Sequence, residues 1–465
     1  MCIFFEGGFF VSFAGKKNKK AIKLSPTQII AITFALIILL GTCLLCLPIA
    51  SRDGQPADLL TALFTATSST CVTGLILADT WSQWSGFGQI VILCMIEIGG
   101  LGFMSAASLV VFILRRKIGL RQRMLMAQAL SVNEMEGVVR LQKWVLLGSL
   151  TIQMTGALIL FFRFLALDYS LWQSLKWGVF HAISAFCNAG FDITGNIAPG
   201  QNLIVFNQDP VILITVMALI IVGGLGFFVW EEVATVRSLK KYSVYTKLVL
   251  LTTVSLIVGG ALAIGFLEWN NPGTLGGMDV PRKILNACFQ SVTVRTAGFT
   301  SVDQMALTDG GKAVSIFLMF IGGSSGSTAG GIKTVTFLVL VLFVLSRARG
   351  RSTVTVFKRT VPHEKIMDAA TIVFLITGLA VAGAIFICAT SPVGFTEALF
   401  ETASALATVG LTAGVTPSLS VAAKLMIIVF MYFGRVGILT ISLGFLMGDK
   451  AADRFRYADT NLLIG

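Results

Sequence analysis

The sequence predicts an all-α membrane protein in which four parallel helix–pore loop–helix repeats surround a central pore, with eight transmembrane helices. Three observations predict this fold. Only 12% of the 465 residues are charged and 55% are hydrophobic, whereas a soluble domain carries about 25% charged residues. Basic residues gather in blocks between long apolar stretches, and two short motifs recur in the same order four times. A lipid bilayer is the solvent that suits such a composition.

The distribution of basic residues indicates a membrane topology and argues against a nucleic-acid partner, although the net charge is +12. Most Lys and Arg residues lie in five blocks: 16–23, 115–123 with Arg140 and Lys143, 237–247, 347–365 and 450–456. Cytoplasmic loops of membrane proteins carry an excess of such residues. We therefore expect a multi-pass protein of the cell (plasma) membrane with these blocks and both termini in the cytoplasm.

The chain offers little material for an enzyme or a metal site. It has only two histidines, His181 and His363, and no nucleophile–base set at membrane depth. Cys43 and Cys46 have CxxC spacing without a second pair, so we interpret them as small buried hydrophobes. No enzymatic activity is expected.

Eight stretches with few or no charges are long enough to cross a bilayer, which takes about 20 helical residues. They are 28–49, 87–113, 144–167, 210–230, 248–267, 313–345, 369–390 and 421–447.

A shorter, semi-apolar segment that ends in glycine lies between the two stretches of each pair. The four glycines are Gly74, Gly190, Gly298 and Gly410, at intervals of 116, 108 and 112 residues. A phenylalanine precedes the glycine by ten residues in three segments, and by nine in the third, where it is Phe289. A nearly fixed period of this kind indicates an internal repeat.

The second helix of each repeat carries its own motif. The motifs are Ile98-Gly-Gly-Leu-Gly-Phe103, Val222-Gly-Gly-Leu-Gly-Phe227, the Gly-rich stretch after Ile321, and Phe433-Gly-Arg-Val-Gly437. Two spans return the chain to its starting side, so the repeats are predicted to be parallel. The predicted segments are an N-terminal cytoplasmic piece (1–24), repeat 1 (25–114), repeat 2 with its preceding loop (115–236), repeat 3 with an intramembrane loop at 322–331 (237–346), repeat 4 with its preceding loop (347–448) and a cytoplasmic tail (449–465).

The short segments are predicted to be pore loops. Irregular backbone at membrane depth is tolerated where protein buries it or water bathes it, and the C-terminal end of a half-helix favours a cation. Glycine tolerates φ > 0, and rings of carbonyls can replace the hydration shell of a cation. Alternatively, the glycines are close-packing or kink residues, which are common in membrane helices. The candidate filter residues are Val72, Thr73, Gly74, Asn188, Ala189, Gly190, Thr296, Ala297, Gly298, Thr408, Val409 and Gly410.

A Gly-rich stretch interrupts the second helix of the third repeat, where each glycine costs about 1 kcal/mol relative to alanine. A tight helix crossing of small residues is one interpretation. A phosphate-binding loop is excluded because Ile332 separates Gly331 from Lys333. The remaining interpretation is a movable loop that blocks ions below the filter. The residues are Gly322, Gly323, Ser324, Ser325, Gly326, Ser327, Thr328, Ala329, Gly330 and Gly331.

Three charged features accompany these motifs. Arg435 lies within the last span, where a charge costs about 2.5–3.5 kcal/mol. It is predicted either to form a barrier that hydrogen-bonds the Gly-rich loop, or to pair with a carboxylate such as Glu97. Arg295 is expected to pair behind the filter with an acid such as Glu401. The Glu231–Glu232 pair is interpreted as a solvated helix end.

Four sequence motifs resemble the ion-translocating subunits of the Trk/Ktr/HKT potassium transporter superfamily. They are Cys71-Val-Thr-Gly-Leu75, Arg295-Thr-Ala-Gly-Phe299, Gly326-Ser-Thr-Ala-Gly-Gly-Ile-Lys333 and the helix that carries Arg435. The resemblance runs from about residue 25 to the end, and eight spans rather than ten indicate the KtrB type.

The resemblance implies a potassium-translocating subunit of an uptake system. Glycine at all four filter positions implies potassium as the transported ion, while sodium coupling or transport stays open. It further implies that 322–331 is a gating loop, that the protein is a homodimer in the lipid bilayer, and that a separate cytosolic KtrA/TrkA-like RCK ring carries the regulatory nucleotide. The alternative is an alternating-access K/Na secondary transporter, whose inverted repeats do not match the parallel order predicted here.

Overall fold

The computed structural model describes residues 26–102 and 138–437. Four of its helices are long and apolar enough to cross a membrane, and each opens one predicted repeat. These helices are α1 (Pro26–Leu45), α7 (Val138–Ala166), α11 (Val244–Glu268) and α15 (His363–Thr390). Their outer faces carry exposed apolar side chains such as Phe162, Phe266 and Phe374, as expected for surfaces that contact lipid. The chain is a helical membrane protein.

A short helix follows each long one and is too short to span. The four are α2 (Leu59–Thr70), α8 (Leu171–Phe186), α12 (Val280–Thr293) and α16 (Phe395–Leu406). Side-chain caps begin two of them: Asp58 accepts from the amide of Thr61 and Ser170 from that of Gln173. At 12 to 16 residues, they reach about 18–24 Å at 1.5 Å per residue, less than a hydrocarbon core of about 30 Å. We call them the pore helices.

The second helices of the four repeats follow the pore helices, and those of the second and third repeats are interrupted. These helices are α4 (Gly86–Leu101), α9 (Pro210–Leu225) with α10 (Phe227–Thr235), α13 (Asp309–Phe320) with α14 (Thr334–Ala348), and α17 (Val421–Val436). The sequence predicts a break in the third repeat alone and a single span over 210–230. This stretch is bent in the structure, because α9 and α10 meet at 96°. Gly226 lies between them at φ 95°, a conformation that a residue with a Cβ rarely adopts.

The other two second helices end at the same kind of residue. Gly102 follows α4 at φ 81°, and Gly437 follows α17 at φ 93°. The rest of the predicted spans 87–113 and 421–447 lies mostly outside the described residues. By length and composition the described part has four spanning helices, or five if the bent α9–α10 pair is counted. The count of eight therefore stays a prediction.

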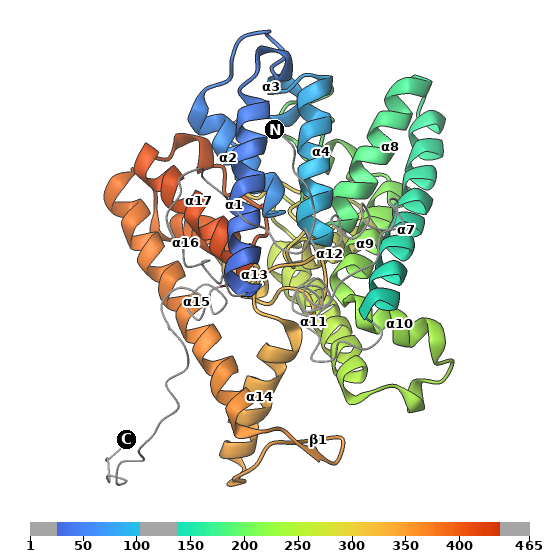
Figure 1. Cartoon of the computed structure of the whole chain (residues 1–465), viewed down its shortest axis with the longest axis vertical. Helices are drawn as coiled ribbons and strands as arrows, with labels where there is room; N and C mark the ends of the chain where they lie inside the picture. Colours follow the sequence, from blue (N-terminus) through green and yellow to red (C-terminus); the bar gives the residue numbers. More distant parts are fainter. Residues whose placement is uncertain (1–25, 103–137, 438–465) are drawn as a thin grey trace, which may run out of the picture.

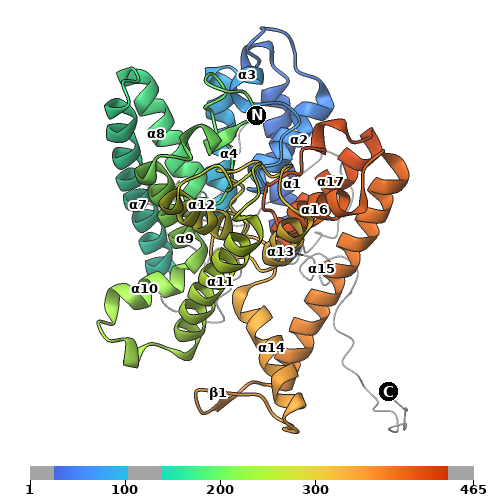
Figure 2. The same ribbon diagram turned by 180° about the vertical axis from the view of Figure 1, so that it is seen from behind.

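The helices pack in a closed order. The second helix of each repeat contacts the pore helix of the next: α4 packs on α8, α9 on α12, and α13 on α16. The fourth repeat returns to the first, because α17 packs on α2. Figures 1 and 2 show the short helices gathered in the upper part of the molecule, with α14 and α15 extending below them.

The remaining elements are small and connect the larger ones. They are α3 (Thr80–Gln83), η1 (Pro48–Ala50), η2 (Asn202–Phe206), η3 (Leu239–Lys241), η4 (Thr416–Ser418) and the antiparallel pair β1 (Thr355–Val356) and β2 (Arg359–Thr360).

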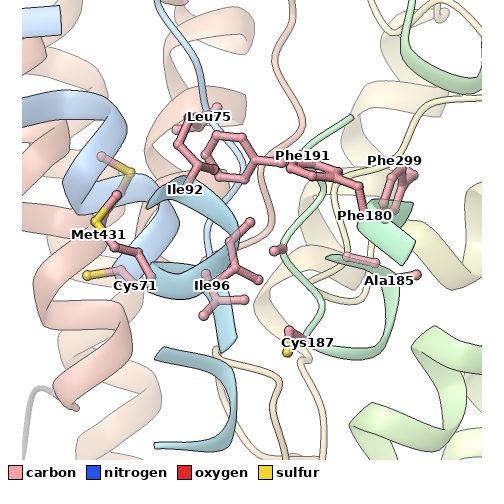
Figure 3. Packing of buried hydrophobic residues seen from close by; sticks show 14 of the residues in the cluster. Cys71, Leu75, Ile92, Ile96, Phe180, Ala185, Cys187, Phe191, Phe299 and Met431 are labelled. Atoms are coloured by element: carbon pink, nitrogen blue, oxygen red, sulfur yellow. The ribbon is translucent and has the colours of Figure 1, made fainter. Parts of the chain in front are cut away.

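The core lies around the pore helices. The repeated phenylalanine of each pore helix is buried: Phe64, Phe180, Phe289 and Phe400. The residue after each repeat glycine is also a large buried hydrophobe, namely Leu75, Phe191, Phe299 and Leu411. Figure 3 shows Leu75 next to Ile92 of α4, with Phe191 and Phe299 further from this helix in the same layer. Each turn is thus anchored in the apolar core on both sides.

Candidate functional site

The four predicted filter segments share one backbone conformation. The residue two places before each glycine has positive φ: Val72 (56°), Asn188 (59°), Thr296 (67°) and Thr408 (52°). The glycines follow at 98°, 69°, 81° and 92°. Positive φ is uncommon outside glycine, so its occurrence at four matched positions indicates that the four turns serve one structural purpose.

The glycines lie together in a closed ring. A Cβ added to Gly74 would overlap the carbonyl oxygen of Ala189, and one on Gly190 would lie 2.7 Å from that of Ala297. A Cβ on Gly298 would overlap the carbonyl oxygen of Val409. The ring closes at Gly410, whose added Cβ would overlap the carbonyl oxygen of Thr73. The four turns therefore approach each other so closely that their backbones leave no room for a side chain.

Hydrogen bonds tie each turn back to its own pore helix. The amides of Thr73, Ala189 and Val409 donate to carbonyls five residues earlier, at 2.7–2.8 Å. In the third repeat the amide of Ala297 donates to Thr293, four residues earlier, at 3.0 Å. This turn is one residue shorter, which explains why Phe289 precedes its glycine by nine residues. The amides are thus satisfied within each repeat. The carbonyl oxygens of the same residues lie against the glycine of the neighbouring turn.

The residues of the turns are buried, and none is charged. The side-chain oxygens of Thr73, Asn188 (Oδ1) and Thr408 have no hydrogen-bond partner within the described part of the chain. Within that same part, no group of three His, Cys, Asp or Glu residues could hold a metal ion. The only ligands that the four turns offer a cation are thus neutral oxygens.

The Gly-rich stretch forms a loop directly against two of these turns. Its ends pair with each other, since the amide of Gly322 donates to Ile332 at 2.9 Å. A Cβ on Gly322 would lie 3.1 Å from Cγ2 of Thr296, and one on Gly330 would overlap Oγ1 of Thr408. The small residues of 322–331 therefore let the loop approach the third and fourth turns.

The second repeat supplies most of the backbone bonds that hold the loop. Ser324 and Thr328 donate from their amides to the carbonyls of Gly224 (2.9 Å) and Gly223 (3.2 Å). The amide of Phe227, the first residue of α10, has no acceptor within its helix and donates to the carbonyl of Gly326 at 2.8 Å. The break at Gly226 therefore forms part of the surface on which the loop rests.

Arg435 joins the loop to the first repeat. Its Nη1 donates to the carbonyl of Thr328, and its Nη2 donates to the carbonyls of Gly99 and, at 2.9 Å, Gly100. The alternative partner, Glu97, instead accepts from Nε2 of Gln153 at 3.0 Å and from Sγ of Cys187 at 3.4 Å. Of the two predicted partners, the structure therefore shows Arg435 hydrogen-bonded to the Gly-rich loop and not to Glu97.

The predicted pair of Arg295 with Glu401 is wrong. Arg295 donates from Nη2 to the carbonyl of Gly322 at 3.2 Å. Glu401 instead accepts from Oγ1 of Thr412, from the amide of Ala413 and from Oγ1 of Thr416. Donors from its own repeat satisfy this carboxylate, so it braces the chain beyond the fourth turn.

The corner between α10 and α11 belongs to this site, which the sequence did not indicate. Tyr245 donates from its hydroxyl to the carbonyl of Ser325 at 3.1 Å, and Glu232 accepts from the hydroxyls of Ser243 and Thr246. Glu232 therefore fastens α10 to α11 and is more than a solvated helix end.

Sequence signals for these missed contacts were weak. The Gly-Gly-Leu-Gly motif shared by the first two repeats coincides with the ends of α4 and α9, but the same motif also suits close helix packing. Nothing in the sequence near Tyr245 indicates a bond to a loop 80 residues away.

Comparison with known proteins supports these observations. The TrkH family of cation transport proteins matches residues 1–453. The chain is 40% identical to Ktr system potassium uptake protein B of Bacillus subtilis, covering 96% of this chain and 98% of that protein. It is 37% identical to the potassium/sodium uptake protein NtpJ of Enterococcus hirae, with 97% and 99% covered. The crystal structure of the potassium transporter TrkH from Vibrio parahaemolyticus shares the fold, with a TM-score of 0.72 at 18% identity over 92% of this chain and 86% of that one. The chain belongs to the TrkH family of cation transport proteins.

Proposed function

We propose that this protein is the potassium-translocating membrane subunit of a Ktr/Trk-type potassium uptake system, and that it conducts ions like a channel. The observation that carries the proposal is the closed ring of Gly74, Gly190, Gly298 and Gly410, in which each glycine lies against a carbonyl oxygen of the next turn. Carbonyl rings of this kind can replace the hydration shell of a cation. Because no carboxylate lies in the turns, the ion is held weakly enough to leave.

The names of the relatives support potassium, and one of them includes sodium. We assign potassium as the main ion and leave sodium as a possible second one. The membrane potential supplies the driving force, about 2.3 kcal/mol per charge for each 100 mV.

The loop 322–331 is proposed as the gate, with Arg435 as its brace. Its contacts with Thr296 and Thr408 support a position immediately beside the filter. Three relatives are described as proteins of a Ktr system, which supports a separate regulatory partner. We propose that a cytosolic RCK ring of the KtrA/TrkA kind binds the nucleotide and moves the loop, and that the membrane subunit is a homodimer.

The finer architecture belongs to the same proposal. Four parallel repeats (25–114, 115–236, 237–346 and 347–448) contribute eight spans in the plasma membrane. The segments 1–24 and 449–465 lie in the cytoplasm. The closed order of helix contacts supports this arrangement, and it argues against the inverted repeats of an alternating-access transporter.

Rubidium uptake into proteoliposomes tests the function. The full chain is reconstituted with only a potassium-diffusion potential and no sodium or proton gradient. We expect rubidium to accumulate, and potassium to compete with it better than sodium does. Uptake that appears only with a sodium or proton gradient would favour the alternating-access transporter.

Shortening the loop within 322–331 tests the gate. The shortened protein is expected to take up rubidium faster than the intact chain, because the barrier beside the filter is smaller. Unchanged or slower uptake by a deletion variant that elutes as a folded species would refute the gate.

A further inference from the structure

We propose that a single buried water molecule between the second and third repeats links the filter to the gating loop, and that Arg295 and Asn188 hold it. This inference deepens the proposed function, on which its link to the gate rests. The site itself stands on geometry that is independent of transport.

A small cavity lies behind the second turn. It measures about 10 Å³ and is lined by Asn188, Ile220, Ile221, Gly224, Thr253, Val292, Arg295 and Gly323. A cavity of about 10–15 Å³ is the smallest that holds one water molecule, provided that it offers two or more polar partners. The volume of this cavity therefore fits one water and nothing larger.

Two buried polar atoms on residues that line this cavity await partners. Oδ1 of Asn188 and Nε of Arg295 have no hydrogen-bond partner within residues 26–102 and 138–437. Asn188 is 1% exposed and Arg295 is 8% exposed. A buried polar group without a partner is unfavourable, because it loses its hydrogen bonds to water. One water can accept from the guanidinium and donate to the amide oxygen, which satisfies both groups.

The other ends of these two side chains are already engaged. Nδ2 of Asn188 donates to Oγ1 of Thr296 at 3.5 Å, and Nη2 of Arg295 donates to the carbonyl of Gly322 at 3.2 Å. With the water in place, one continuous chain of hydrogen bonds runs from the third turn to the first residue of the gating loop. Displacement of Gly322 would then alter the hydrogen bonds of Asn188 through Arg295 and the water.

Only one of the four repeats can build this site. The residue three places before the glycine is Cys71, Cys187, Arg295 and Ala407 in turn, so the third repeat alone has a long donor. The residue two places before the glycine is an amide only at Asn188. The site therefore exists only where the second repeat meets the third, beside the loop that breaks the fourfold pattern.

The direct test is a high-resolution map of the full chain in lipid nanodiscs. We expect a compact density within about 2.6–3.2 Å of both Asn188 Oδ1 and Arg295 Nε. A map that resolves both side chains and shows no density between them would overturn the proposal. This result would leave the proposed function untouched, whereas loss of rubidium uptake by the intact chain would not affect the density.

Two substitutions test the link to the gate. Arg295→Lys keeps the charge but cannot reach Gly322 and the water together. Thr253→Val removes a hydroxyl that lines the cavity, and Thr252→Val is its matched control, because Thr252 is equally buried but does not line the cavity. We expect resting rubidium uptake to rise about two- to tenfold for Arg295→Lys and less for Thr253→Val, as for the loss of a hydrogen bond.

The variant that combines Arg295→Lys with Thr253→Val decides whether these two residues act through the same cavity. Its effect is expected to be smaller than the product of the two single effects, because residues that share a partner are not additive. Multiplicative effects, or an Arg295→Lys protein that behaves like the intact chain, would overturn the link.

Discussion

The four filter turns are built alike in all four repeats, whereas the second helices beside them end in different ways. At the turns, all four repeats have the same pair of positive φ angles, and each glycine meets a carbonyl of the next turn. In the second helices, single glycines at positive φ follow α4, α9 and α17, whereas the third repeat inserts the whole loop from Ile321 to Lys333 between its two helices. The four repeats are therefore nearly alike in the turns, where the ion would lose its water, and differ in the second helices beside the turns.

The difference has a physical basis. A dehydrated ion at the centre of a ring needs oxygens at similar distances, so the four turns are constrained alike. A barrier needs only one element that moves, and four equal loops would have to move together. The loop is held by the second repeat on one side and by Arg435 on the other, and we expect release of either side to shift it.

The largest effect is expected from a side chain placed in the ring. Gly410→Ser forces a Cβ onto the carbonyl oxygen of Thr73 at φ 92°. We expect the preference for potassium over sodium to fall at least about tenfold, which corresponds to 1.4 kcal/mol. Rubidium uptake with sodium as competitor measures this preference.

Gly378→Ser is the matched control for this prediction. Gly378 lies in α15, and an added Cβ there meets nothing within 4 Å. This variant is expected to keep the selectivity of the intact chain. Equal selectivity of the Gly410→Ser and Gly378→Ser proteins would show that the ring does not select the ion.

A smaller effect is expected from release of the loop on its Arg435 side. Arg435→Met removes the bonds to Thr328, Gly99 and Gly100. We expect resting rubidium uptake to rise roughly fivefold or more, since hydrogen bonds to a charged group contribute about 1.5–3 kcal/mol each. Selectivity should change little, because the turns are not touched. A variant with altered selectivity and normal resting uptake would place Arg435 at the filter instead.

The sequence predicts the symmetric layer better than the asymmetric one. Matched glycines at a period near 110 residues are local signals, so the sequence alone is enough to place the four glycine turns and the short helices before them. It does not identify the partner of Arg295, because Gly322 offers a backbone carbonyl, and any residue type can supply one. The break at Gly226 escapes prediction for a related reason: a glycine in a membrane helix is equally consistent with close packing.

Release of the loop on the side of α11 is expected to have a milder effect. Tyr245→Phe removes only the hydroxyl that donates to Ser325, a net loss of about 0.5–1.5 kcal/mol. Resting rubidium uptake should rise about twofold. Tyr242→Phe, three residues earlier in the same segment, is the control and should have no effect. Equal uptake by the two variants would mean that the corner between α10 and α11 does not restrain the gate.

The smallest effect is expected from an ion pair that lies beside the filter but does not contact the gating loop. Lys312 of α13 pairs with Glu397 of α16 at 3.0 Å, and the side chains are 10% and 29% exposed. The pair joins the third repeat to the pore helix of the fourth without touching the loop 322–331. A double-mutant cycle with Lys312→Met and Glu397→Gln should give a coupling of about 0.5–1 kcal/mol in thermal unfolding, with resting uptake unchanged.

The pair of Lys365 with Asp368 within α15, 71% and 60% exposed, is the control and should give a coupling near zero. If the cycle on Lys312 and Glu397 instead changed resting uptake, the two layers would be mechanically joined, and the symmetric turns would take part in gating.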